Sequence, residues 1–264
     1  MKKLFGLVLT VVISVGFLSA FMAIGPTSAQ TLSWDFQCHT HTHPWLDQLT
    51  DNEIRAQYES VNAAFTAHGL ATPEHTSYPG GRLDKKGRVI AITSEYRLTG
   101  RVVWGEFNTW PWTDWYRLRA AQLKRTTSES TMKGWIDDAV ADDSWLVVLT
   151  HDVKANPTGY GCTPAMLAYI LDYALQKENE GVLQILTLSE AYDIWSGATQ
   201  PEAAVSFTFD DSWVTDYENV YPMFKQRGIA GTSYVITASI ENVEWDDTAQ
   251  RLTWGMIENM VNWV

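Results

Sequence analysis

The sequence predicts an α/β fold in which strand–helix units build one largely parallel sheet or barrel. Short apolar runs alternate with segments of helical periodicity along residues 34–264, which is the pattern of consecutive βα units. The chain ends on a helical segment that lacks a following strand and begins on a strand that lacks a preceding helix. Because each end supplies what the other lacks, residues 30–264 are predicted to form a single domain of the barrel class.

Residues 1–29 have the composition of an export signal. Lys2 and Lys3 precede an almost wholly apolar run over residues 4–24, and small residues follow at 27–29. The run is also long enough to cross a bilayer, so an uncleaved N-terminal anchor is the alternative to cleavage. We therefore expect a secreted or cell-surface protein, acting as a monomer.

Charge and cysteine content restrict the partners and the covalent structure. The formal net charge of −12 disfavours nucleic acid or an anionic membrane as a partner, because both require basic patches. The two cysteines are Cys38 and Cys162, and export would permit a disulfide between them. The sequence does not show whether their Cα atoms come within bonding range.

The first part of the domain, residues 30–195, alternates predicted strands with capped helices. Strands are expected at residues 34–38, 145–150 and 183–188, and residues 77–81 are expected to be the end of a strand that breaks into a turn. Thr50 and Glu53 form a capping box that opens a helix, and Thr163 followed by Pro164 opens another. This arrangement predicts βα units throughout the first part.

The second part, residues 204–264, follows a small polar linker at residues 196–203. Strands are expected at residues 204–209 and 231–237, with a capping box at Thr215 and Glu218 between them. The final helix, residues 253–264, is predicted to bury Trp254, Ile257 and Val261 against the strand at 34–38.

Two stretches at opposite ends of the domain carry residues suited to metal chemistry. His39 and His43 leave the first strand with a spacing that lets one turn of chain hold one cation, and Asp210 and Asp211 leave a later strand. A catalytic zinc site uses three protein ligands and an open position. Two histidines and one aspartate would complete such a set, the second aspartate would act as a base, and His151, after another strand, as an acid.

These stretches resemble motifs of the polysaccharide deacetylase family, the NodB-homology domain of carbohydrate esterase family four. Residues 208–212 match the family's Thr-Phe-Asp-Asp-Gly motif with Ser212 in place of glycine, and residues 39–43 match its His-Thr-x-x-His motif. The resemblance implies a distorted (β/α) barrel that removes acetyl groups from N- or O-acetylated glycan polymers with one divalent metal ion. Zinc is the expected ion, and cobalt, nickel and manganese stay open. The resemblance implies that Asp210 is the base. It implies that Asp211, His39 and His43 are the metal ligands.

Two looser matches extend the resemblance. Residues 77–81 match the family's Arg-Pro-Pro-Tyr-Gly turn in part, which would place Tyr78 and Pro79 at the substrate and let the Gly80 N–H donate to an oxyanion. The arginine by which the family steadies its catalytic aspartate is absent from this turn. Residues 149–152 resemble the family's last histidine motif and make His151 the general acid.

A tryptophan-rich loop lies where the family has an Asp-Trp motif. Asp114 and Trp115 match that motif weakly, and Trp104, Trp110 and Trp112 crowd the same proline-containing loop. The rings could stack against sugar rings of the substrate, or they could pack the loop onto the domain. The sequence leaves both interpretations open.

The order of the motifs departs from the family. The Asp-Asp segment comes last here, whereas in the family it comes first, and joining Val264 to Ser33 would restore the usual order. The chain therefore resembles a circular permutant in which residues 196–203 join the family's old termini.

Other functions remain open at this stage. The same fold could act on another amide or acetyl ester, and a catalytically weak protein could bind glycans through its tryptophans. Each motif also has an ordinary structural interpretation, since paired histidines occur on surfaces and paired aspartates often begin helices. The chain could also be a piece of a longer protein, and the particular glycan is not predicted.

Overall fold

The computed structural model describes residues 33–242 and 250–262. The predicted export signal lies outside the described residues. Leu32–Val264 form one compact unit, as expected for a single barrel-class domain. Within the described ranges, no helix has the length and apolar character needed to cross a membrane.

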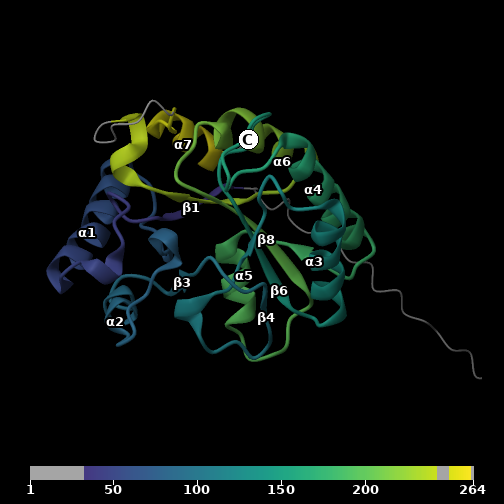
Figure 1. Ribbon diagram of the computed structural model, residues 1–264, viewed down its shortest axis with the longest axis horizontal. Helices are drawn as coiled ribbons and strands as arrows, with labels where there is room; N and C mark the ends of the chain where they lie inside the picture. Colours follow the sequence, from purple (N-terminus) through teal and green to yellow (C-terminus); the bar gives the residue numbers. More distant parts are fainter. Residues whose placement is uncertain (1–32, 243–249, 263–264) are drawn as a thin grey trace, which may run out of the picture. The chain divides into compact units, whose positions relative to one another are not determined.

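A nine-stranded sheet forms the centre of this unit (Figure 1). Its main path runs in the order β3-β2-β1-β9-β8-β6-β4, with β5 beside β6 and β7 beside β8. The strands are β1 (Asp35–Cys38), β2 (His75–Ser77), β3 (Thr99–Arg101), β4 (Phe107–Asn108), β5 (Ala121–Gln122), β6 (Trp145–Thr150), β7 (Gln184–Ile185), β8 (Ala204–Asp210) and β9 (Thr232–Val235). Every pair is parallel except β4 with β6.

The sheet curls until its two sides meet. The segment before β5 pairs with β3, because the Leu118 N–H donates to the Gly100 carbonyl at 2.9 Å and the Val102 N–H donates to the Leu118 carbonyl at 2.9 Å. The same segment continues into β5, which pairs with β6. The predicted distorted (β/α) barrel is thus confirmed.

Seven α-helices pack against the described part of the sheet (Figure 1). They are α1 (Asp51–Ala67), α2 (Arg88–Thr93), α3 (Glu129–Ala141), α4 (Pro164–Asn179), α5 (Leu188–Trp195), α6 (Tyr221–Arg227) and α7 (Trp254–Val261). α2 packs beside β3, and α3 packs beside β6 and β8. The predicted caps of the first and fourth helices are confirmed, since Thr50 and Glu53 form a capping box and Thr163 accepts from the Met166 N–H.

Strand β6 is buried on both faces, as its continuous apolar sequence predicts. Leu146 and Val148 belong to the large core beneath the helices. Trp145, Val147 and Leu149 point the other way, into a second core inside the curl of the sheet. Full burial of an aliphatic side chain stabilises a fold by about 1.5–3 kcal/mol, so this strand anchors both layers.

The sheet order becomes regular when the end of the chain is read into its beginning. Counted from β8, the strands β8, β9, β1, β2 and β3 are then successive neighbours. The two ends lie together: the Ser33 hydroxyl donates to the Val261 carbonyl at 3.0 Å, and the Trp34 N–H donates to the Met260 carbonyl at 3.4 Å. Figure 1 shows α7 alongside β1, as predicted for a permuted barrel.

The last helix buries a slightly different face from the predicted one. Ile257 is buried, but Trp254 and Val261 are only partly buried, and Met260 is buried in their place. Trp254 instead stacks on the ring of His68 with centroids 4.1 Å apart. The sequence pattern predicted the helix correctly, but packing against α1 and β1 decides which of its faces is buried.

Two elements differ from the sequence prediction. The strand expected at 183–188 is reduced to β7, because Thr187 caps α5 in a capping box with Glu190. Thr215 does not cap a helix, since its hydroxyl accepts from the Val153 N–H at 3.2 Å. The residues after it form a π-helix, Asp216–Val220, ahead of Pro222, whose missing N–H interrupts regular α-helical bonding. The sequence left a disulfide between Cys38 and Cys162 open, and the structure shows both cysteines free and buried.

Candidate active site

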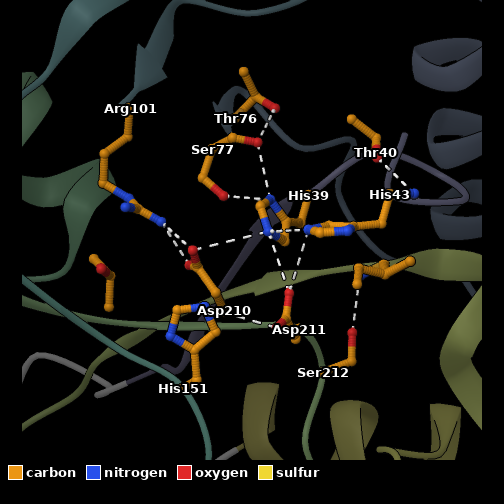
Figure 2. Close-up of polar contacts among 12 residues, drawn as sticks. His39, Thr40, His43, Thr76, Ser77, Arg101, His151, Asp210, Asp211 and Ser212 are labelled. Atoms are coloured by element: carbon orange, nitrogen blue, oxygen red, sulfur yellow. Dashed lines mark hydrogen bonds and ion pairs between the residues drawn. The ribbon is translucent and has the colours of Figure 1, made fainter. Parts of the chain in front are cut away.

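The candidate site lies at the carboxyl ends of three parallel strands (Figure 2). His39 follows β1, Asp210 is the last residue of β8, and His151 follows β6. Parallel strands bring their carboxyl ends to one edge of a sheet, where barrel folds carry their catalytic groups. Residues from opposite ends of the chain therefore meet in one place.

Two histidines and one aspartate form a compact cluster at this edge. The ligand atoms of His39, His43 and Asp211 all lie within 4.8 Å of one another. The Nε2 atoms of His39 and His43 lie 3.4 Å and 3.6 Å from Asp211 Oδ1, and 3.2 Å from each other. This is the convergence that the motif spacing predicted.

His39 is held in one orientation by β2. Its Nδ1 lies 2.9 Å from the Ser77 carbonyl oxygen. Because a carbonyl can only accept, Nδ1 carries the hydrogen and Nε2 presents its lone pair to the cluster. Burial acts to lower the pKa of His39, but the charges of Asp210 and Asp211 outweigh it, and the pKa is raised.

His43 is placed by a tight loop after β1. Thr40 and His43 both adopt positive φ, and the Thr40 hydroxyl accepts from the His43 N–H at 3.0 Å. Gln57 of α1 accepts from the N–H groups of His41 and Thr42 at 2.9 Å and 2.8 Å. Burial and the neighbouring His39 lower the pKa of His43 to about 4, so this ring is neutral at neutral pH and can act as a ligand.

The donor set fits a divalent metal ion. Asp211 Oδ1 is buried without a well-oriented hydrogen-bond donor, an arrangement that is costly unless a cation satisfies the oxygen. Burial acts to raise the pKa of Asp211, but the hydrogen-bonding contact with His39 and the charge of that ring act most strongly against it, so the pKa is lowered. Two imidazoles and a carboxylate are ligands that zinc and neighbouring transition metals accept.

The serine at position 212 fits the backbone that a glycine would favour. Asp211 and Ser212 have φ of 77° and 57°, and such left-handed geometry costs an ordinary residue about 1–2 kcal/mol. The Ser212 hydroxyl accepts from the Ile236 N–H at 2.8 Å, which offsets part of this cost by about 0.5–1.5 kcal/mol. Arg251 also donates to the Asp211 carbonyl at 2.8 Å, so the turn is held from two sides.

Asp210 is paired with an arginine that the sequence analysis missed. Nη2 of Arg101, on β3, lies 2.6 Å from each carboxylate oxygen of Asp210, and both side chains are buried (Figure 2). The turn at residues 77–81 lacks an arginine, but Arg101 of β3 pairs with this aspartate instead. Arg101 ends a three-residue strand, which is too short for a periodic pattern, so only the fold reveals the pair.

His151 lies on another side of Asp211. Its Nε2 is 3.7 Å from Asp211 Oδ2, whereas His43 approaches Oδ1. Nδ1 of His151 is buried and has no hydrogen-bond partner among the described residues. The structure thus places His151 at the cluster, as expected, without a carboxylate to orient its ring.

The partly matched turn at 77–81 exposes only its glycine tip. The Gly81 N–H donates to the Tyr78 carbonyl at 2.8 Å, and Gly80 sits exposed at φ 62°. Tyr78 and Pro79 are buried, and the Tyr78 hydroxyl packs against Gly100. These two side chains therefore support the turn from beneath, and a contact of Tyr78 or Pro79 with the substrate stays a prediction.

The tryptophan-rich loop packs largely against its surroundings. Asp114 pairs with Arg117 at 3.0 Å. Trp115 packs edge-on against Tyr192 of α5 with centroids 5.1 Å apart, and Trp112 belongs to the border of the inner core. These contacts favour the packing interpretation of Trp112 and Trp115 and do not join Asp114 to His151.

Comparison with known proteins decides the family. The model of the polysaccharide deacetylase family matches residues 28–99 and 197–262, which is just over half of the chain. The chain belongs to the polysaccharide deacetylase family. Two separate matched segments at opposite ends are consistent with circular permutation. The matched segments contain the His39, His43 and Asp211 cluster, whereas Arg101 and His151 lie between them.

Three solved structures of deacetylases resemble parts of this chain. IcaB from Ammonifex degensii is 27% identical with a TM-score of 0.40, covering 45% of this chain and 48% of that one. Streptococcus pyogenes PplD, in complex with acetate, is 23% identical with a TM-score of 0.35, covering 44% and 51%. A de-N-acetylase from Aggregatibacter actinomycetemcomitans is 16% identical with a TM-score of 0.34, covering 44% and 50%. The matches thus span about half the length of each structure. A comparison with curated proteins gave no match.

Proposed function

We propose that this protein is an exported, metal-dependent hydrolase that removes acetyl groups from an N-acetylated polysaccharide. The observation that carries the proposal is the meeting of His39, His43 and Asp211 beside a second, buried carboxylate. The family makes deacetylation by hydrolysis of an amide the expected reaction. The apolar run after Lys2 and Lys3 supports export.

His39, His43 and Asp211 would hold the metal, and zinc is the ion that their chemistry fits best. Such an ion polarises a carbonyl oxygen and makes water acidic enough to attack at neutral pH. The other catalytic roles, those of the base and the acid, belong to side chains of the protein.

Asp210 is the base of the proposed reaction. Its carboxylate lies 3.8 Å from His39 Nε2 and is fixed by two contacts to Arg101. The guanidinium stays charged and matches a carboxylate in its planar geometry. It therefore holds the Asp210 carboxylate in the orientation needed to accept the proton of the attacking water. His151, near the other oxygen of Asp211, donates a proton to the leaving amine.

Gly80 would complete the proposed site. It is the exposed tip of the turn that follows β2, and a backbone N–H at that tip would stabilise charge developing on the carbonyl oxygen. The two departures from the family's motifs, the arginine missing from the turn and Ser212 in place of glycine, would favour a catalytically weak protein, but the structure compensates for both. Arg101 supplies the charge, and Ser212 adopts the required backbone.

The test is acetate release from N-acetylglucosamine oligomers, measured with metal analysis of the same preparation. The wild type should contain one ion per chain and lose activity to a chelator, with recovery on adding zinc. Asp210→Asn and His151→Ala should each keep the ion and lower kcat by about 10²–10⁴-fold. Near-full turnover in both variants would contradict the mechanism. Release of acetate only from esters or from non-sugar amides would redirect the proposal to another deacylase.

A further inference from the structure

The guanidinium of Arg101 lies over the ring of a buried tyrosine. Its carbon is 4.9 Å from the centroid of the Tyr234 ring, and both side chains are fully buried. Arg101 orients Asp210, the base of the proposed reaction. A group that fixes the position of this arginine therefore also bears on the base.

Strand register places Tyr234 beside Asp210. The two residues are partners in the parallel pair of β8 and β9, so their side chains leave the same face of the sheet. That face is the inner one, because Tyr234 belongs to the core inside the curl together with Val147 and Leu149 of β6. Arg101 comes from β3, which β2 and β1 separate from β9. Its side chain thus reaches Asp210 across an interior that the Tyr234 ring lines.

The hydrogen bonds of Arg101 hold only the end of its guanidinium. Nη1 donates to the Val102 carbonyl at 3.2 Å, and Nη2 lies 2.6 Å from each carboxylate oxygen of Asp210 (Figure 2). Nε is buried and has no hydrogen-bond partner within the described part of the chain. The tilt of the guanidinium plane is therefore left to packing. The Tyr234 ring supplies such packing, and an aromatic face attracts a guanidinium most strongly where water is excluded.

The hydroxyl of Tyr234 does not act as a counter-charge to the arginine. Burial, first among the causes, raises the pKa of Tyr234, so the hydroxyl is neutral at any pH at which the protein is folded. It is also buried without a well-oriented hydrogen-bond partner among the described residues, which is a cost at a core position. The ring is thus the part of Tyr234 that serves Arg101.

We propose that Tyr234 is a positioning residue whose ring holds the Arg101 guanidinium in the plane that pairs with Asp210. The inference rests on the proposed function, in which Asp210 accepts the proton of the attacking water. Without the ring, the guanidinium can tilt within the core, and the carboxylate loses its fixed orientation. Because Tyr234 is fully buried, it acts through the arginine and takes no part in substrate binding or proton transfer.

The experiment measures acetate release from a short N-acetylglucosamine oligomer by Tyr234→Leu, Tyr234→Met and Tyr234→Phe. The first two changes remove the ring and should lower kcat about tenfold, within the range that a desolvated cation–π contact implies. KM and metal content should not change. Tyr234→Met is included because a flexible thioether fills the space that Tyr234→Leu leaves open. Tyr234→Phe keeps the ring and should keep kcat.

The matched control is Phe207→Leu. Phe207 of β8 is also buried, but its ring lies in the outer core against Phe224, with centroids 5.9 Å apart. This change should lower the urea midpoint, as removal of a buried ring does, and leave kcat of the folded protein unaltered. A loss of kcat equal to that of Tyr234→Leu would overturn the positioning role, because it would mean general loosening of the sheet. An equal loss in Tyr234→Phe would overturn it too, because the hydroxyl would then be the active part.

A double variant tests whether the ring acts through the arginine. The compact ammonium of Arg101→Lys has no plane to lie on the ring. Tyr234→Leu should therefore lower kcat less than threefold in this background. A full tenfold loss in the double variant would show that the ring acts on the site without Arg101, and would overturn the inference.

Urea unfolding of the same four proteins separates this inference from the proposed function. If the ring holds Arg101, the midpoint should fall less in the double variant than the two single losses together. If the wild type releases acetate but kcat is unchanged in Tyr234→Leu and Tyr234→Met, the positioning role is refuted and the function stands. If no acetate is released but the losses are non-additive, the contact stands and the reaction is refuted. Additive losses without acetate release refute both.

Discussion

The candidate site is built by two regions of the barrel that contribute in different ways. The first, strands β8, β9, β1 and β2, comes from both ends of the chain, falls in the segments that match the family model, and supplies His39, His43 and Asp211. The second, residues 100–196, lies outside the match and supplies Arg101 and His151. The comparison shows that the residues proposed to bind the metal lie in short sequence motifs. Arg101 and His151, in contrast, each come from the end of a separate strand with no motif around them.

The largest effect of any single change in the first region is expected from Asp211→Ala. Removal of the carboxylate leaves two imidazoles where the proposed site needs three protein ligands. Metal content should fall from one ion per chain to none, and activity should be lost with it. His41→Ala is the matched control, because His41 lies between the two cluster histidines but contacts Thr237 at 2.8 Å instead. An Asp211→Ala protein that retains a full ion would show that the cluster is not the metal site.

A change in the second region should lower turnover without removing metal. Arg101→Lys keeps a positive charge but loses the planar pairing with Asp210, so kcat should fall by about 10–100-fold, below the loss expected for removing the base itself. Arg101→Ala should also destabilise the fold by about 3–5 kcal/mol, since it leaves a buried carboxylate unpaired. Metal analysis and urea unfolding measure the two effects separately. Metal loss in Arg101→Lys would place this arginine among the groups that hold the ion.

The contact between the two regions predicts a pH-dependent stability. His75 of β2 packs against Tyr192 of α5 and Thr99 of β3, and burial, first among its causes, lowers its pKa from 6.5 to about 4. As pH falls from 6.5 towards 4, the unfolded chain takes up this proton first, so the free energy of unfolding decreases. The contribution reaches up to about 3 kcal/mol. His75→Gln should flatten this part of the curve in urea titrations at several pH values, and an unchanged slope would contradict it.

The smallest effect is expected from restoring the family's chain order. A join of about five glycine-rich residues spans roughly 12 Å, and the Ser33 hydroxyl already contacts the Val261 carbonyl. Joining Val264 to Ser33 and opening the chain at residues 196–202 should give a folded protein with the same metal stoichiometry. Far-UV circular dichroism, metal analysis and acetate release check this. A rejoined chain that is insoluble or inactive, beside an active native order, would refute the permutation.

Much of the fold could be predicted because its signals are local. The Thr50–Glu53 capping box and the apolar run of β6 were both read correctly from neighbouring residues. β7 and the segment after Thr215 were misread because a cap and a proline redirect the backbone there. Whether such a residue caps a helix depends on partners elsewhere in the fold. The Val153 N–H, for example, donates to the Thr215 hydroxyl, which therefore does not cap a helix.

The residues of the site likewise divide into those predicted from local sequence and those that only the fold reveals. The spacing of His39 and His43 and the pair Asp210–Asp211 were sufficient to predict the cluster, because adjacent residues leaving a strand have few directions available. Tyr78 could not be assigned from the turn motif, since only packing against Gly100 shows that its side chain faces inward.

The sequence by itself determined the strand–helix alternation, the motifs proposed to bind a metal and the permuted order of the chain, because these depend on periodicity and spacing along the backbone. Tertiary structure alone decided that Arg101 pairs with Asp210 across 109 residues and that both cysteines stay free. The physical reason is that a buried charge needs an opposite charge nearby in space, and nothing in the spacing along the chain specifies which strand end will provide it.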